Sequence, residues 1–254
     1  MSIMNKLFDS KKQKDINKHG NIGKIPVLQS GVNIDSGNFI QLFSACIGKT
    51  LANQIACSEQ VVKGQNWSVD FQKGIIAFGA SIFPVQFIGN ESSVNNTWLW
   101  AWGNKSPLPD SVKVDVIKLK AIGEKYGFSQ LTTAQLDIDE VITGHVLSII
   151  AAALHEENVC YYRGPHATGA IFVIVKDLPL NVFKQVGSDT FIELVMKIIQ
   201  QYELNHKVFI ESFLLHNNCR YVWDGNVLTA TFPEGRKVYV KLDECGRIAS
   251  IQGI

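Results

Sequence analysis

The sequence predicts an α+β protein: an antiparallel β-meander packed against helices, followed by a smaller module of helix and antiparallel meander. Apolar residues recur at steps of three or four in some segments and alternate with other residues in others. The strand-like segments follow one another with short turns between them, which favours antiparallel pairing of sequential strands. With 46% apolar residues in 254, the chain can also supply a full core.

Residues 1–34 form a polar, Lys- and Asn-rich leader that we expect to be largely disordered. The first 24 residues hold six Lys and two Asp, so the basic excess of the chain lies on this leader. The net charge of the whole chain is +1, which predicts neither a nucleic-acid nor a membrane partner. The sequence shows no secretory h-region and no apolar run of spanning length, so we expect a cytoplasmic location.

An α+β domain is predicted over residues 35–178. Apolar spacing predicts one long helix over residues 39–62. Four short strands are then predicted, at 67–72, 74–79, 81–89 and 97–103. Pro84 lies inside the third strand and predicts an edge strand or a bulge there.

Helical spacing returns after Pro109, with Asp110 as the expected N-cap and Gly127 at the expected C-terminal end. A second helix is predicted over 138–156, with its start near Thr133 or Asp137. Two further strands are predicted at 159–163 and 170–175.

Residues 179–254 are predicted to form the C-terminal module. Its helical part, 189–215, is expected to break near Asn205. Four strands follow, with hairpin signals at Asp224-Gly225, Glu234-Gly235 and Cys245-Gly246. A single fused domain is the alternative to this division into two parts.

The segment "NNTWLWAWGNKSP", residues 95–107, contains three of the five tryptophans. Alternation along a strand places Trp98, Trp100 and Trp102 on one face. Burial in a core layer is the preferred interpretation, because three exposed indoles favour aggregation. A partly open groove is the alternative, and it makes the three tryptophans candidate binding residues, with Asn104 as a polar neighbour.

The segment "YYRGPHATG", residues 161–169, is the second candidate binding region. Tyr162, Arg163 and His166 combine an aromatic ring, an anion-binding fork and a titratable imidazole near the end of a strand. The ordinary interpretation is a surface hairpin with a solvated arginine. Which other groups contact these three side chains depends on the fold.

We expect neither a metal nor a cofactor, and no motif identifies a catalytic residue. The five cysteines are widely spaced without a C-x-x-C pair, which is typical of reduced thiols. The Gly-Lys-Thr at 48–50 lacks the earlier glycine and the strand of a phosphate-binding loop. His145 and Glu156 do not have the one-turn spacing of helical metal ligands.

The Trp-rich strand "TWLWAWGN", the helix with "IGEKYGFSQLT" and the later "YYRGP" together resemble a family of bacterial proteins known only as a domain of unknown function. The resemblance covers residues 40–175 approximately, and the hallmark of that family is a Trp-x-Trp-Ala-Trp-Ala-Asn strand. Gly103 stands here where the family has Ala. The resemblance implies a bacterial protein and names no reaction.

Three functional hypotheses follow from these patterns. The first is a non-enzymatic binding protein, of an accessory or immunity type, that recognises a protein or a small ligand near the Trp strand and the hairpin at 161–166. The second is a hydrolase or transferase that uses His166 and Arg163 with an acidic partner brought in by the fold. The third makes the second meander a surface for homo-oligomerisation.

Overall fold

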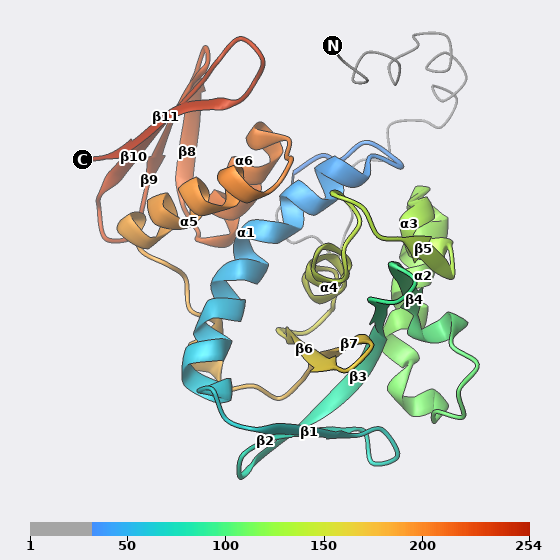
Figure 1. The fold of residues 1–254 in the computed structure, drawn as a ribbon. Coiled ribbons are helices and arrows are strands. Elements are labelled where there is room, and N and C mark those ends of the chain that lie inside the picture. Colours follow the sequence, from blue (N-terminus) through green and yellow to red (C-terminus); the bar gives the residue numbers. More distant parts are fainter. Residues whose placement is uncertain (1–31) are drawn as a thin grey trace, which may run out of the picture.

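The computed structural model describes residues 32–254, which form two antiparallel sheets with helices between them (Figure 1). The α+β class is therefore confirmed. Most of the predicted leader, residues 1–31, lies outside the described residues. Val32 and Ile34, at the end of that leader, are buried against the core.

Helix α1 (Phe39–Cys57) is the central helix of the molecule and continues into one π-helical turn, η1 (Ser58–Val62). The Asn38 side chain caps its start by accepting a hydrogen bond from the Gln41 backbone N–H. α1 packs against α4 (Gly144–Ala153) on one side and α6 (His206–His216) on another. It is therefore buried over most of its circumference, as its many apolar positions require.

The first sheet has seven strands within the described residues, in the order β1-β2-β3-β4-β5, with β7 paired to β3 and β6 to β7. The predicted four-strand meander is confirmed as its first part. The strands are β1 (Trp67–Asp70), β2 (Ile75–Phe78), β3 (Ser81–Ser92), β4 (Thr97–Trp100), β5 (Gln135–Asp137), β6 (Cys160–His166) and β7 (Gly169–Val175).

Strand β3 is the centre of this sheet, so the prediction of an edge strand at Pro84 was wrong. Pro84 is tolerated because it lies opposite Ile75, where the β2 hydrogen bond is made by the next residue, Val85, to Gly74. On its other side Pro84 lies beyond the paired end of β7. The bulge of β3 comes later, between Phe87 and Gly89.

Gly89 follows this bulge and brings β3 close beneath the indole of Trp98. A Cβ at this position would lie 2.6 Å from a Trp98 ring carbon and 2.5 Å from the Leu99 carbonyl oxygen. The bulge also shifts the alternation of β3, so that Gln86 lies opposite Ile174 and Glu91 lies opposite Ala170. One extra residue therefore sets which side chains of β3 face the helices.

The predicted fourth strand ends early, because the chain turns into a 3₁₀-helix, η2 (Ala101–Gly103), after Trp100. Trp102 consequently leaves the face that holds Trp98 and Trp100. The prediction that all three indoles share one strand face was wrong for Trp102.

The middle helices follow the prediction in part. The short η3 (Asp110–Val112) leads into α2 (Val114–Tyr126), which ends at Gly127 in the left-handed conformation, as expected. The predicted helix 138–156 begins only at Gly144, because the Asp139 side chain accepts hydrogen bonds from the Val141 and Ile142 N–H groups and fixes a turn. Thr143 is the N-cap. The short α3 (Ser129–Thr132) and the strand β5 were not predicted.

The C-terminal part matches its prediction closely. After η4 (Leu180–Phe183), the helices α5 (Ser188–Gln201) and α6 are separated by a break at which Asn205 caps α6. The second sheet is a four-strand antiparallel meander with the order β11-β10-β9-β8. Its strands are β8 (Arg220–Asp224), β9 (Val227–Thr231), β10 (Lys237–Leu242) and β11 (Ile248–Gly253).

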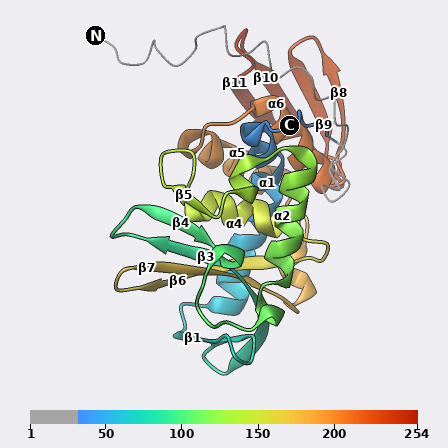
Figure 2. The ribbon, with the colours of Figure 1, turned by 90° about the vertical axis from the view of Figure 1, so that its right-hand side faces the viewer.

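The layers run from the β1–β2 hairpin through β3, β6 and β7 to α4 and α1, and then through α5 and α6 to the second sheet (Figure 2). Buried apolar residues from all these layers form one cluster. None of the helices described in residues 32–254 combines the length and the apolar character that a bilayer crossing needs. The division at residue 178 stays a prediction.

Candidate functional site

The tryptophans of β4 are core residues. Trp98 and Trp100 are fully buried and pack edge to face with ring centroids 5.3 Å apart. Trp98 also meets Phe172 edge to face at 5.2 Å, and the Trp100 indole N–H donates to the Gln130 carbonyl oxygen at 2.9 Å. Their rings fill space below the helices and offer no face to a ligand in solution.

Trp102 and Asn104 lie apart from this aromatic layer. Trp102 is half-buried, with the Lys120 ammonium 4.5 Å above its ring. Asn104 accepts a hydrogen bond from the Ser106 N–H at 2.8 Å, so its side chain closes a local turn. The indole N–H groups of Trp98 and Trp102 have no acceptor within residues 32–254.

The hairpin of β6 and β7 does not bring its three candidate residues together. Tyr162 points to the face of the β1–β2 hairpin and packs edge to face on Phe78 at 4.8 Å. Burial raises the pKa of its phenol. Arg163 points to the opposite face, where its guanidinium lies 3.9 Å from the Glu91 carboxylate. His166 is exposed at the turn, with Thr168 beside its ring at 3.4 Å.

The histidine nearest to Arg163 in the fold is His145, at the start of α4. Its Nδ1 lies 2.9 Å from the Tyr161 hydroxyl. Burial and then the neighbouring Arg163 charge lower the pKa of His145, while burial raises the pKa of Tyr161. The lowered pKa of the imidazole and the raised pKa of the phenol both favour the neutral forms of this hydrogen-bonded pair.

A cleft lies elsewhere, between α2 and α4 above β3 and β7, and holds a cavity of about 50 Å³. This volume exceeds the 10–15 Å³ or so that one water molecule needs. The apolar part of its lining is supplied by Phe87, Ile88, Val116, Leu119, Ile122, Ala151, Leu154 and Ile174.

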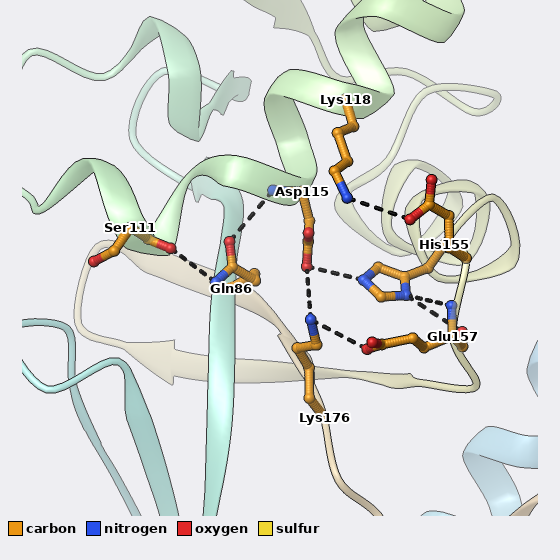
Figure 3. Close-up of polar contacts among 8 residues, drawn as sticks. Gln86, Ser111, Asp115, Lys118, His155, Glu157 and Lys176 are labelled. Carbon is orange, nitrogen blue, oxygen red and sulfur yellow. Dashed lines mark hydrogen bonds and ion pairs between the residues drawn. The ribbon is translucent and has the colours of Figure 1, made fainter.

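The polar wall of the cleft centres on a buried pair, Asp115 in the first turn of α2 and His155 just after α4 (Figure 3). His155 Nε2 lies 2.9 Å from Asp115 Oδ2, and both side chains are only 8% exposed. The Glu157 backbone N–H reaches His155 Nδ1 at 3.0 Å. His155 therefore faces the Asp115 carboxylate with Nε2 and the Glu157 backbone with Nδ1, which also lies 3.3 Å from the Glu157 carbonyl oxygen.

Lys176, just after β7, completes the charge balance of this wall (Figure 3). Its ammonium lies 3.6 Å from Asp115 Oδ2 and 3.2 Å from a Glu157 carboxylate oxygen. Burial of Asp115 opposes its ionisation, but the hydrogen bond from His155 and the charges of His155, Lys176 and Lys118 outweigh it. Together they hold the pKa of Asp115 below its ordinary value.

Two further contacts fix the walls of the cleft relative to each other. The Gln86 amide on β3 donates to the Ser111 carbonyl oxygen at 2.9 Å and accepts from the Asp115 N–H at 3.3 Å, which ties α2 to the sheet. At the mouth, the Lys118 ammonium lies 3.3 Å from the Glu156 carboxylate and links α2 to the end of α4.

The polar side chains of the cleft are thus engaged mainly with one another. Both ring nitrogens of His155 have partners, so this imidazole has no free nitrogen to take a proton from a substrate. The described residues contain no group of three His, Cys, Asp or Glu side chains that could hold a metal ion. The arrangement suits binding of an apolar group better than acid–base chemistry.

The sequence patterns did not indicate this site, because they assigned a role to neither His155 nor Asp115. The available signal was weak: Asp115, Leu119 and Ile122 lie on one side of α2 at helical spacing. The pairing of Asp115 with residues 40 and 61 positions away depends on the fold.

A family model described as "Family of unknown function (DUF6882)" matches residues 40–178, which is more than half of the chain. The resemblance over residues 40–175 is confirmed at this level, and the role of the Trp-rich strand as its hallmark stays a prediction. Neither the curated proteins nor the solved structures give a match.

Proposed function

We propose a function from the geometry of the chain itself, because the chain belongs to a family of unknown function (DUF6882). The protein binds a ligand that places an apolar group in the cleft between α2 and α4. The observation that carries this proposal is the combination of an apolar floor with a polar wall whose side chains are held in place by one another. Such a wall is preorganised, so binding does not have to order it.

The ligand is either a small molecule or an apolar side chain of a partner protein. The second possibility keeps the accessory or immunity-type role that the sequence suggests. A cytoplasmic location accords with the five cysteines, all of which are free thiols. Homo-oligomerisation through the second sheet stays a separate proposal, which a solution mass above 28.2 kDa supports.

The test is to fill the cleft. Ala151 lines it from α4, and Ala151→Leu adds three carbon atoms to the cavity. A fragment screen on the ¹⁵N-labelled full chain is expected to shift amide signals of residues 115–122 and 151–156 in the wild type and to leave them unmoved in the variant. Ala153→Leu is the matched control that keeps the shifts, because Ala153 lies two residues further along α4, is half-buried and does not line the cleft.

Equal fragment-induced shifts in the wild type and in Ala151→Leu contradict the proposal, because the fragments then bind outside the cleft. A near-native amide spectrum of the variant shows that the added carbons have not unfolded it. Overpacking of this kind costs about 1–3 kcal/mol, which most folded domains tolerate.

One observation favours an enzyme as the second candidate function. Arg163 has the acidic neighbour that this hypothesis required, Glu91, at 3.9 Å. The histidine in this group is His145 and not His166, since His145 and Arg163 both lie over the Phe172 ring. A hydrolase or transferase at this position predicts that turnover of a substrate is lost in Arg163→Met and kept in His166→Ala.

A further inference from the structure

The hydrogen-bonding capacity that the cleft leaves unused defines the chemistry of its ligand. Five polar side chains line the cleft: Gln86, Asp115, Lys118, His155 and Glu156. A ligand that binds there must pair with whichever donors and acceptors these side chains do not already use among themselves.

Most of this capacity is already used. The Gln86 amide gives its oxygen to the Asp115 N–H and one N–H to the Ser111 carbonyl group. His155 contacts Asp115 through Nε2 and the Glu157 backbone through Nδ1, so both of its ring nitrogens are engaged. Lys118 and Glu156 pair with each other at the exposed mouth, with side chains 56% and 72% exposed.

The Asp115 carboxylate is the exception. Its Oδ2 receives both contacts, the one from His155 at 2.9 Å and the one from Lys176 at 3.6 Å. No hydrogen bond or ion pair within residues 32–254 is made to Oδ1, and Oδ1 is also not one of the sealed, unpartnered polar atoms of the core. Asp115 Oδ1 is therefore an accessible acceptor on the wall of an apolar cleft.

The charge on this acceptor is already balanced. The Lys176 ammonium lies next to the same carboxylate, and Lys118 adds a second positive charge nearby. A cationic ligand would meet two ammonium groups around one carboxylate, whereas a neutral donor forms the hydrogen bond without that repulsion. An anionic ligand is repelled by the Asp115 carboxylate itself, although the lining leaves the second N–H of the Gln86 amide and N–H groups of Lys118 as donors.

We infer that the ligand of the cleft is a neutral, apolar group that carries one hydroxyl or N–H donor and gives it to Asp115 Oδ1. This inference rests on the proposed function, and it names the class of ligand for the same cleft. A short aliphatic alcohol, an indole or the hydroxyl-bearing side chain of a partner belongs to this class. The volume of about 50 Å³ holds only part of such a ligand, so the rest of a ring such as cyclopentanol or indole lies in the open cleft.

The test uses three five-membered-ring probes: cyclopentanol donates and accepts a hydrogen bond, cyclopentanone only accepts one, and cyclopentane does neither. Each is titrated into the ¹⁵N-labelled full chain, and dissociation constants are taken from the amide shifts of residues 115–122 and 151–156. Cyclopentanol is expected to bind about tenfold more tightly than the other two, because a hydrogen bond to a charged acceptor outweighs one to water.

Asp115→Asn sharpens the test. His155 Nε2–H and Lys176 both need an acceptor at the position of Oδ2, so the amide oxygen stays there and the amide NH₂ occupies the position of Oδ1. The preference of cyclopentanol over cyclopentanone is then lost, since the new NH₂ donates to either oxygen. Asp110→Asn, which neutralises an exposed carboxylate outside the cleft lining, is the control in which the preference persists.

Three outcomes separate the two proposals. Equal affinity of all three probes for the wild type overturns the donor inference and leaves the cleft as a binding site. Loss of the cyclopentanol preference in the Asp110→Asn control as well also overturns it, because the preference then does not come from Asp115. Probes that shift the same amides equally in Ala151→Leu overturn the proposed function and the inference together.

Discussion

The Trp-rich strand and the α2–α4 cleft lie on the same side of the first sheet, and they differ in how their polar groups are used. In the strand, Trp98 and Trp100 are sealed from solvent by the layers above them. In the cleft, Asp115 is nearly as buried, yet one of its oxygens stays accessible. The run of aromatic residues thus stabilises the fold. The candidate site lies instead where a hydrogen-bond acceptor without a partner lines an apolar cleft.

The largest expected effect is on stability, at the strand. Trp98→Ala removes a fully buried indole that packs on Trp100 and Phe172, so the free energy of unfolding in urea is expected to fall by about 3–5 kcal/mol. Trp98→Phe is expected to lose less, because most of the ring contacts survive. Trp102→Ala is the matched comparison, and its half-buried ring predicts a clearly smaller loss.

Equal losses of unfolding free energy in Trp98→Ala and Trp102→Ala would contradict the distinction between a fully buried strand and a peripheral indole. Tryptophan emission gives an independent check, since Trp98 and Trp100 predict blue-shifted fluorescence that resists acrylamide. Red-shifted, readily quenched emission that persists in Trp223→Phe would show an open strand.

The second effect concerns the buried pair of the cleft and its dependence on pH. The folded-state pKa of Asp115 is lower than its ordinary value of 3.8, so ionised Asp115 stabilises the fold above that pH. Asp115→Asn is expected to cost about 1.5–3 kcal/mol of unfolding free energy at neutral pH. As the pH falls through 3.8 and then through the folded-state pKa, this difference from the wild type is expected to disappear.

Urea denaturation at several pH values between neutrality and acid measures this difference. Asp110→Asn is its control, because the Asp110 carboxylate pairs with Lys113 while 96% exposed and therefore contributes little. A loss in Asp115→Asn that stays constant down to acid pH would show that shape, and not charge, accounts for the cost.

The sequence predicted the elements with strong local signals. Gly127, the break at Asn205 and the hairpin turns of the second sheet all depend on residues next to each other in the chain. The errors have causes that the local pattern of residues does not show. Pro84 sits in a central strand because β7 stops beside it, and Trp102 leaves its face because a 3₁₀ turn follows Trp100.

The site was harder to predict than the fold, for the same reason. Its key carboxylate and imidazole come from two helices, and the ammonium that balances them follows a strand of the later hairpin. Each residue alone has an ordinary role in its own element, such as an acidic side chain in the first turn of a helix. Only the packing of α2 and α4 over the sheet creates the spare acceptor.

The third effect concerns the stability of the β6–β7 hairpin, which the sequence indicated as a candidate binding region, and it is expected to be close to zero. Arg163→Met and His166→Ala change side chains at a half-exposed and an exposed position, so each is expected to alter the unfolding free energy by only about 0.5 kcal/mol. Cyclopentanol binding to the cleft is expected to stay unchanged in both. Weaker binding in Arg163→Met would show that the hairpin and the cleft act as one site.

The last effect is expected at the mouth of the cleft, and it tests whether the Lys118–Glu156 pair controls the entry of a ligand. Lys118 and Glu156 are mostly exposed, so their attraction is screened, and Lys118→Met is expected to change the unfolding free energy by less than about 1 kcal/mol. The pair nevertheless bridges the two helices that form the cleft, and a probe must pass it. If the pair gates entry, Lys118→Met speeds association and dissociation of cyclopentanol together, which NMR line shapes measure, while the dissociation constant stays constant. A changed dissociation constant with unchanged line broadening would instead show that Lys118 contributes to binding as a lining residue and does not control entry.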